Sequence, residues 1–217
     1  TNIVFFPTAG GDLKIWEYPD LESELSHRYL VSVDIGGHTK TADYHAVTVL
    51  DRFPMIAGGV PEVVAEMRYH SDHDILAYDV ARLAKYYNNA LLVIESNTLE
   101  THDEERDTDG ASAEYILDII SRIYRNLYAR KASAAHIKKG KPTMWGFHTN
   151  ASTKLAIISF LKECSKDHLW IERSKYMPDE MAIYEKDERG RYNATPGEGN
   201  HDDVLMSRAI ALYICYF

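Results

Sequence analysis

Short apolar runs bounded by turn-forming residues dominate the first half of the sequence. The run YLVSVDI (residues 29–35) is rich in β-formers and stops at two glycines, and HAVTVL (residues 45–50) follows a polar turn. Residues 60–70 alternate well enough to indicate a third strand, so the three runs predict a hairpin extended into an antiparallel meander. The run ALLVIES (residues 90–96) is almost wholly apolar, which is typical of a strand buried on both faces.

Helical spacing appears in the segments between and after these runs. Residues 72–87 carry Ile75, Leu76, Val80, Leu83 and Ala84 on one side, with Ser71 or Asp72 available to cap the first turn. Further helices are predicted over residues 112–127, from Asn150 or Ser152 through residue 162, and from residue 201 to the end.

The remaining segments are shorter. Residues 144–147 predict a fourth, parallel strand, and residues 180–192 predict a polar hairpin. Residues 1–28 indicate a lead-in or linker with one short strand at 13–16, ahead of a domain spanning 29–217. The order of elements predicts an α/β domain with a mixed central sheet, an antiparallel three-strand meander and flanking helices.

Composition places the chain among ordinary globular proteins. The 217 residues suffice for one large domain with a full core, and no apolar run reaches the length of a membrane span. The first twenty residues lack the order of a signal peptide, so we expect an intracellular protein with no membrane partner. Cys164 and Cys215 are too few and too far apart for a disulfide framework or a zinc clip, and buried thiols are expected.

The charge is unevenly distributed along the chain. The net charge is −9, yet residues 119–162 contain nine basic residues and no acidic one, which leaves −18 for the rest. Such asymmetry suits a protein that holds a polyanion on one face and gathers carboxylates around cations on another, although a solvated helix pair explains it equally well.

Acidic residues lie at the ends of two predicted strands and at the start of the last predicted helix, where the fold could bring them together. Asp34 ends the first predicted strand and Glu95 ends the buried strand, and a charged residue there destabilises the fold unless it is paired or bound to a metal. Asp202 and Asp203 open the last helix. Each has a structural alternative, as a turn cap, an ion pair or a helix cap, but together they indicate a site for hard divalent cations.

These motifs together resemble a known family. VSVDIGGHTKTADYHAVTVLD, LLVIESNT, GFHTNASTKLAIISFL and GEGNHDDVLMSRAIAL resemble the C-terminal nuclease domain of phage terminase large subunits, which has a ribonuclease-H-like fold, and GGDLKIWEYPD resembles the segment that joins this domain to its motor. The resemblance covers almost the whole chain. Its most specific parts are Asp34-x-Gly, followed by Ala42-Asp43-Tyr44, and the His201-Asp202-Asp203 triplet.

The resemblance implies a role for each acidic residue. Asp34, Glu95 and one or both of Asp202 and Asp203 would be catalytic ligands of two Mg²⁺ or Mn²⁺ ions, and Asp43 an accessory ligand. His201 and Lys154 would support this site from its surroundings. The backbone of duplex DNA would contact basic residues, namely Arg122, Arg125, Arg130, Lys131, Lys138, Lys139 and Lys141.

The resemblance also implies a biological setting. The chain would be an endonuclease with little sequence preference that makes the ends of a viral genome during packaging, in the cytoplasm of a bacterial host. Its partners would be duplex DNA, the ATPase motor domain, the portal ring and the small terminase subunit. Gly140-Lys141-Pro142-Thr143 does not fit a phosphate-binding P-loop, so the motor half is expected to be missing, and whether residues follow Phe217 is left open.

Other functions fit parts of the same pattern. A Holliday-junction resolvase or transposase-like nuclease would use a similar set of metal-binding carboxylates and would prefer branched DNA. A non-catalytic docking module of a packaging motor would keep the acidic cluster only for its structural role. His70 and His73, with Asp72 and Asp74, offer a transition-metal alternative without further ligands at zinc spacing. There is no GxSxG nucleophile motif.

Overall fold

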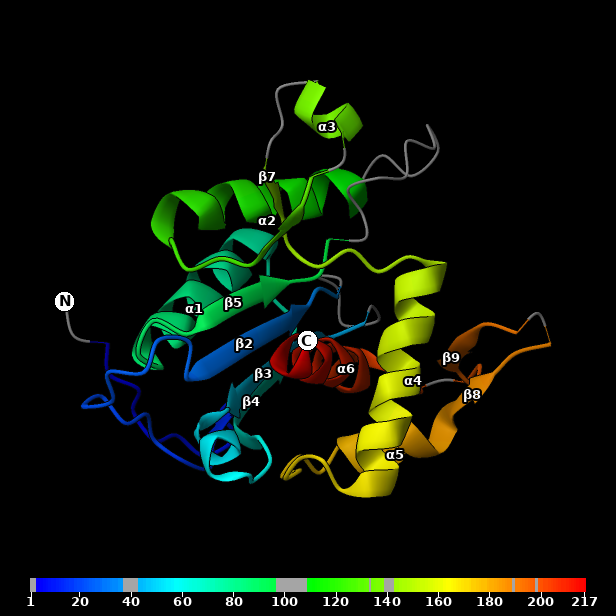
Figure 1. Ribbon diagram of the computed structural model, residues 1–217, viewed down its shortest axis with the longest axis horizontal. Helices are drawn as coiled ribbons and strands as arrows, with labels where there is room; N and C mark the ends of the chain where they lie inside the picture. Colours follow the sequence, from blue (N-terminus) through cyan, green and yellow to red (C-terminus); the bar gives the residue numbers. More distant parts are fainter. Residues whose placement is uncertain are drawn as a thin grey trace.

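A five-stranded mixed sheet forms the centre of the molecule (Figure 1). The computed structural model describes residues 3–36, 43–96, 109–132, 134–138, 143–188, 190–197 and 199–217, with the backbone alone for 109–115, 135 and 136. The sheet order is β1-β4-β3-β2-β5. The strands are β1 (Leu13–Ile15), β2 (Tyr29–Asp34), β3 (His45–Asp51), β4 (Glu62–Tyr69) and β5 (Leu91–Ile94).

The strand pairing follows the predicted pattern. β2, β3 and β4 form the antiparallel meander, with a short 3₁₀ helix (Phe53–Ala57) between β3 and β4, and β5 joins β2 in parallel. The parallel pairing explains why β5 is apolar throughout, because helices cover both of its faces. The lead-in segment contributes β1, which pairs antiparallel with β4 at the sheet edge. The domain division at residue 28 stays a prediction.

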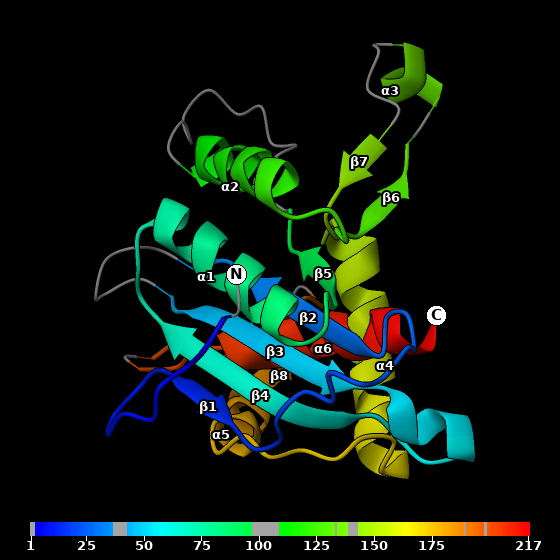
Figure 2. The same ribbon diagram turned by 90° about the vertical axis from the view of Figure 1, so that its left-hand side faces the viewer.

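Two helices cover one face of the sheet (Figure 2). They are α1 (His73–Tyr86), which packs on β2 and β5, and α2 (Asp109–Ile123), which packs mainly on α1, and buried residues of both helices belong to the same core cluster as Val31, Val33 and Val47. Four of the five apolar positions predicted for the first helix are buried, while Ile75 is exposed. Asp72 occupies the N-cap position of α1, but its side chain makes no capping hydrogen bond.

The opposite face carries the C-terminal helix. α6 (Asp203–Tyr216) lies between the sheet and α4 (Ala151–Asp167), so that residues 203–212 are all buried. The fully buried Arg208 is paired with Glu66 at 3.1 Å and with Glu172 at 2.7 Å. These pairs fix α6 to β4 and to the segment before α5, because an unpaired charge at this depth would strongly destabilise the fold.

Asn150 caps α4, as predicted. Its side chain accepts hydrogen bonds from the amides of Ser152 and Thr153, and the Thr153 hydroxyl accepts one from the Asn150 amide. α5 (Met177–Ile183) comes next and leads into the hairpin of β8 (Tyr184–Lys186) and β9 (Tyr192–Ala194). The predicted polar hairpin is therefore correct from Tyr184 onward, while its first part is helical.

The fourth parallel strand predicted over residues 144–147 is wrong. β7 (Thr143–Trp145) pairs antiparallel with β6 (Ala129–Lys131), and the two strands with α3 (Ala134–Lys138) project from the body in Figure 2. Gly146, with φ +81°, redirects the chain after β7, and a Cβ there would lie 2.7 Å from the Ile94 carbonyl oxygen. Phe147 alone therefore reaches β5, in a parallel bridge with Glu95.

No helix among the described residues is long and apolar enough to cross a membrane. Cys164 is buried and Cys215 partly buried, both as free thiols, as expected. Burial raises the pKa of Cys164 to about 12 and that of Cys215 to about 11, so both stay protonated at neutral pH.

Candidate active site at the edge of the sheet

Asp34 and Glu95 lie side by side where two parallel strands end. Val33 of β2 is in register with Ile94 of β5, and the Glu95 amide donates to the Val33 carbonyl at 2.9 Å. Asp34 and Glu95 each follow one member of this pair, so the parallel register brings both carboxyls to the same edge. Glu95 is only 8% exposed, and its bridge to Phe147 fixes its backbone.

Asp202 and Asp203 approach this edge from the start of α6. The Asp202 side chain makes no capping hydrogen bond, because the buried Glu180 carboxylate accepts from the Leu205 amide at 2.8 Å instead. Asp203 accepts a hydrogen bond from the Tyr44 amide at 3.2 Å. The helix-cap alternative therefore does not hold for Asp202, whose carboxylate is available for other contacts.

The pKa values show that these four carboxyls interact. Burial raises the pKa of Asp34 well above its usual range, and the adjacent charge and hydrogen bond of Glu95 raise it further, followed by the charges of Asp203 and Asp202. Burial also raises the pKa of Asp202, against a lowering by Lys154. For Asp203, burial and then the charge of Asp43 raise the pKa to about 6. Several carboxyls are thus crowded in one partly desolvated cluster.

A second group of ligands adjoins the first. One ligand atom each from Asp43, His201 and Asp203 lies within 4.8 Å of the others. His201 Nδ1 is 3.3 Å from Asp43 Oδ1 and 3.8 Å from Asp203 Oδ2. Among the described residues, His70 and His73 belong to no such group, and His70 stacks on the Tyr44 ring at 4.0 Å, so the alternative metal site is not formed there.

This donor set fits a divalent metal ion. Carboxylate oxygens are the ligands that Mg²⁺ and Mn²⁺ prefer, and one imidazole nitrogen is compatible with Mn²⁺. Burial, together with the charges of neighbouring carboxylates, raises the pKa values of Asp34, Asp202 and Asp203, and a bound cation would stabilise their ionised forms. The donors come from β2, β5, α6 and the residue before Tyr44, so rigid elements hold most of them.

Sequence reasoning missed the buried groups that surround this cluster. The Arg68 guanidinium lies 3.7 Å from Asp203 and 3.9 Å from Glu180, and it stacks over the Tyr44 ring at 3.6 Å. Burial raises the pKa of Glu180 to about 8. The available signal for Arg68 was its place with Glu66 at alternate positions of a mainly apolar strand.

A cavity of about 330 Å³ opens beside these residues. It is lined by residues of β4, α5 and the segment before α6, together with Tyr44, and they include Arg68, Tyr176, Glu180 and His201. The cavity adjoins the Asp43, His201 and Asp203 group directly, so a molecule seated there would contact whatever ion this group holds.

The predicted basic contacts are spread over several elements. Lys154, on α4, is close enough to Asp202 to lower its pKa, and it donates to Asn193 at 3.3 Å. Arg122 ends α2 in an ion pair with Asp118 at 2.7 Å, and Arg125 follows it, exposed. Arg130 and Lys131 lie on β6 and Lys138 ends α3, whereas Lys139 and Lys141 lie outside the described residues. Their contact with DNA stays a prediction.

The structure is similar to two solved viral nuclease domains. The large terminase nuclease from thermophilic phage G20c matches with bound magnesium at a TM-score of 0.61, with 18% identity over 95% of this chain and 89% of that one. Its cobalt-bound form gives a TM-score of 0.60 at the same coverage. The human cytomegalovirus terminase nuclease domain, manganese-soaked and inhibitor-bound, matches at 0.53, with 11% identity over 91% of this chain and 89% of that one.

These likenesses establish the fold, because identity this low carries no more than architecture. No protein-family model matches the sequence, and no curated protein sequence matches it. The fold is ribonuclease-H-like, with a mixed sheet and flanking helices, as the sequence predicted.

Proposed function

We propose that the chain is a metal-dependent DNA endonuclease, and that it serves as the nuclease of a viral DNA-packaging motor. The observation that carries the proposal is the meeting of Asp34, Glu95, Asp202 and Asp203 at one edge of a sheet. The shared fold with the terminase nuclease domains of phage G20c and human cytomegalovirus supports the biological setting. Duplex DNA, cut with little sequence preference, is the proposed substrate.

The two aspartates at the start of α6 share Asp43 as a neighbour and differ in their other contacts, which supports two adjoining cation positions. Asp202 interacts with Lys154, Asp43 and Glu95, and Asp203 lies with Asp43 and His201. We therefore assign Asp34, Glu95 and Asp202 to one position, and Asp203 with Asp43 and His201 to the other. When bound, the cations would activate the attacking water and stabilise the departing 3′ oxygen.

The chain's own residues provide the rest of the chemistry. The β2–β5 register and the α6 N-terminus hold the carboxylates at fixed positions before DNA arrives, so little reorganisation is needed. Lys154 partly offsets the negative charge of Asp202, which eases the approach of a phosphodiester to an acidic cluster. The basic residues of the β6–β7 hairpin would hold the DNA backbone without reading bases.

The test is a plasmid-nicking assay with Mn²⁺ and with Mg²⁺. Asp34→Asn keeps the shape of the side chain and removes its charge, and we expect a loss of activity on the order of 100-fold or more. Asp167→Asn, at the exposed end of α4, is the matched control and should cleave like the parent. If Asp34→Asn cleaves as well as Asp167→Asn, the proposed site is wrong.

Substrate preference is measured in the same assay with linear duplex and four-way junction DNA. The proposal predicts scattered cuts in linear duplex and no preference for the junction. A strong junction preference would instead assign the carboxylates to a resolvase. If the parent cleaves neither substrate and divalent cations do not raise its melting temperature, the acidic cluster is structural.

A further inference from the structure

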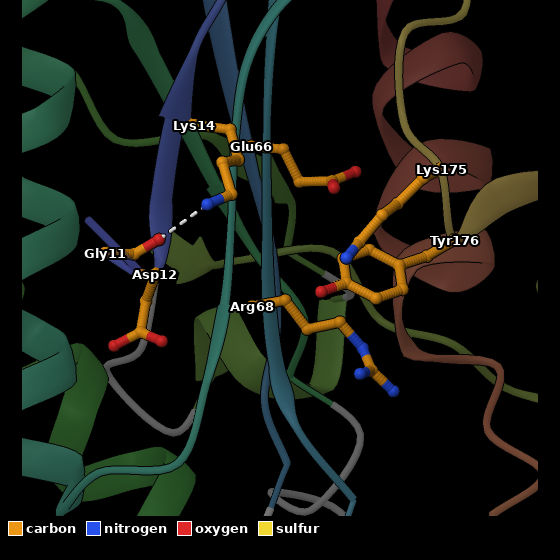
Figure 3. A pocket seen from close by; sticks show the side chains of 8 residues that line it. Gly11, Asp12, Lys14, Glu66, Arg68, Lys175 and Tyr176 are labelled. Atoms are coloured by element: carbon orange, nitrogen blue, oxygen red, sulfur yellow. Dashed lines mark hydrogen bonds between the residues drawn. The ribbon is translucent and has the colours of Figure 1, made fainter.

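A second cavity, of about 240 Å³, lies on the other side of Arg68 from the carboxylate cluster. It is bounded by the edge strand β1, by β4 and by the loop before α5, and Figure 3 shows its lining side chains. Arg68 and Tyr176 line both this cavity and the one beside His201. The two spaces therefore share a wall, and Arg68 stands between them.

The strand register explains how the cavity obtains its charged residues. Lys14 of β1 pairs with Glu66 of β4, and Arg68 lies two positions farther along β4, so all three face the same side of the sheet. Arg68 also pairs with Ala46, which pairs with Asp34 on β2. Arg68 and Asp34 therefore lie in one row across the strands and face the same side of the sheet, so the cavity and the carboxylate cluster lie on that same side.

The charge of the cavity is mainly positive. Lys14 and Lys175 are exposed at its rim, where Lys14 Nζ donates to the Gly11 carbonyl at 2.9 Å, and Arg68 also lines the cavity. The carboxylate of Glu66 is buried and already engaged by Arg208 at 3.1 Å and by the Ser174 hydroxyl at 2.8 Å. Asp12 is the other acidic residue in the lining, and Arg68 is paired at longer distance with Asp203, so the two rim lysines face one carboxylate that Arg208 does not engage.

Arg68 retains capacity to bind an anion. Its buried Nε faces Glu180 at 3.9 Å and its Nη2 faces Asp203 at 3.7 Å. Both distances are longer than a normal N–H···O hydrogen bond, so neither carboxyl engages the guanidinium closely. The rings of Tyr44 and Tyr176 pack against the guanidinium and hold it in place. A planar guanidinium matches the geometry of a phosphate.

We propose that this cavity binds a backbone phosphate of the DNA strand that is cut at the carboxylate cluster. The inference rests on the proposed function, and it adds a contact that lies on the opposite side of the site from the β6–β7 hairpin. Lys14 and Lys175 supply the positive charge at the rim, and Arg68 connects the bound phosphate to Asp203. The three residues position the strand and take no part in bond breaking.

The experiment compares the 217-residue chain with a Lys14→Gln/Lys175→Gln double variant. Both lysines are exposed, and their contacts with the Gly11 carbonyl and the Tyr176 ring lie at the surface, so the melting temperature should change little. Duplex binding is measured by fluorescence anisotropy without divalent cations over a range of salt. We expect the variant to bind DNA more weakly, and we expect the slope of log Kd against log salt concentration to fall by about one.

In the nicking assay, KM should rise several-fold with little change in kcat. Lys85→Gln, exposed on α1, is the control for loss of a surface charge.

Binding and cleavage separate the two proposals. A shallower salt dependence in a parent chain that does not cleave keeps the phosphate site and rejects the nuclease. Cleavage by the parent, with the double variant matching Lys85→Gln in salt dependence and KM, rejects the phosphate site alone. Titration with inorganic phosphate distinguishes the source of the anion. Phosphate binding that depends on the two lysines, with unchanged DNA binding, would also overturn the proposal.

Discussion

Several carboxyl groups in one cluster share few hydrogen-bond donors. Asp203 is buried and accepts a bond from one amide, and Glu180 is buried with one oxygen that has no hydrogen-bond partner among the described residues. Burial raises the pKa of Asp203 to about 6 and that of Glu180 to about 8, and neighbouring acidic charges add to the effect. Ionising these groups therefore costs free energy in the folded protein, which is common where a site binds a charged ligand.

Glu180 gives the clearest pH dependence. Its pKa in the folded protein, about 8, exceeds the ordinary value of 4.5, so the folded chain keeps a proton that the unfolded chain releases. The resulting stability is fully present below pH 4.5 and is lost as the pH rises through 8. Glu180→Gln should therefore become more stable than the parent by roughly 1 to 3 kcal/mol between pH 5 and 8, without metal.

The measurement is thermal or urea unfolding in EDTA at several pH values. Glu163→Gln, exposed on α4, is the control and should follow the parent at every pH. A constant difference between Glu180→Gln and the parent from pH 5 to 8 would contradict the raised pKa. The amide of the variant can still accept from Leu205, so a general loss of packing is not expected.

His201 should tune the preference among metal ions. Its Nδ1 lies close to Asp43 and Asp203, and an imidazole nitrogen favours Mn²⁺ over Mg²⁺ relative to carboxylate oxygen. In His201→Gln we expect Mn²⁺ affinity to fall about 10-fold, with a smaller change for Mg²⁺. Calorimetric titration of the metal-free chain measures both. Equal losses for both ions would show that His201 only positions Asp43.

Individual residues differed in how far the sequence could reveal them. Asp34 and Glu95 stand out because a charge ends an otherwise apolar strand. Arg68 and Glu180 become part of the site only when β4 and α5 pack against the start of α6, which is a tertiary event with no local signature. The proposed assignment of Asp202 and Asp203 to different cation positions likewise depends on their neighbours in space.

At the scale of elements, α4 is positioned by its first turn. The Asn150 capping box satisfies amides at the helix start, one turn before the position from which Lys154 reaches Asn193. Asn150→Ala should cost about 1 kcal/mol, which corresponds to roughly 2–4 °C in melting temperature for a chain of this size. Ser152→Ala, in the same turn but outside the box, is the control. Equal melting temperatures for both variants would contradict the capping role.

Elements with a clear period were predictable, and those set by tertiary contacts were not. The meander, β5, α1, α4 and α6 follow from apolar spacing and capping residues. β7 was misassigned because Met144, Trp145 and Phe147 form an apolar run that Gly146 divides between two sheets. α5 was missed although Pro178, Asp179 and Glu180 provide a typical first turn, because Glu180 and Ile183 were assigned to the following hairpin.

For the whole molecule, acidic residues from the N-terminal half and from the C-terminal helix meet at one edge of the sheet. β1 closes the sheet on the side of β4, β5 closes it on the side of β2, and α6 crosses beneath both β2 and β3. Contacts this remote in sequence cannot be read from local patterns. The family-like motifs nevertheless led to the right architecture, because they mark the ends of β2 and β5 and the start of α6.

The most direct test is a crystal of the chain soaked in Mn²⁺, with anomalous scattering used to locate the ions. We expect one anomalous peak among Asp34, Glu95 and Asp202 and a second beside Asp203, Asp43 and His201, and we expect Asp34→Asn to lose the first peak. A fully soaked crystal with no anomalous density at this edge of the sheet would show that these carboxylates bind no metal.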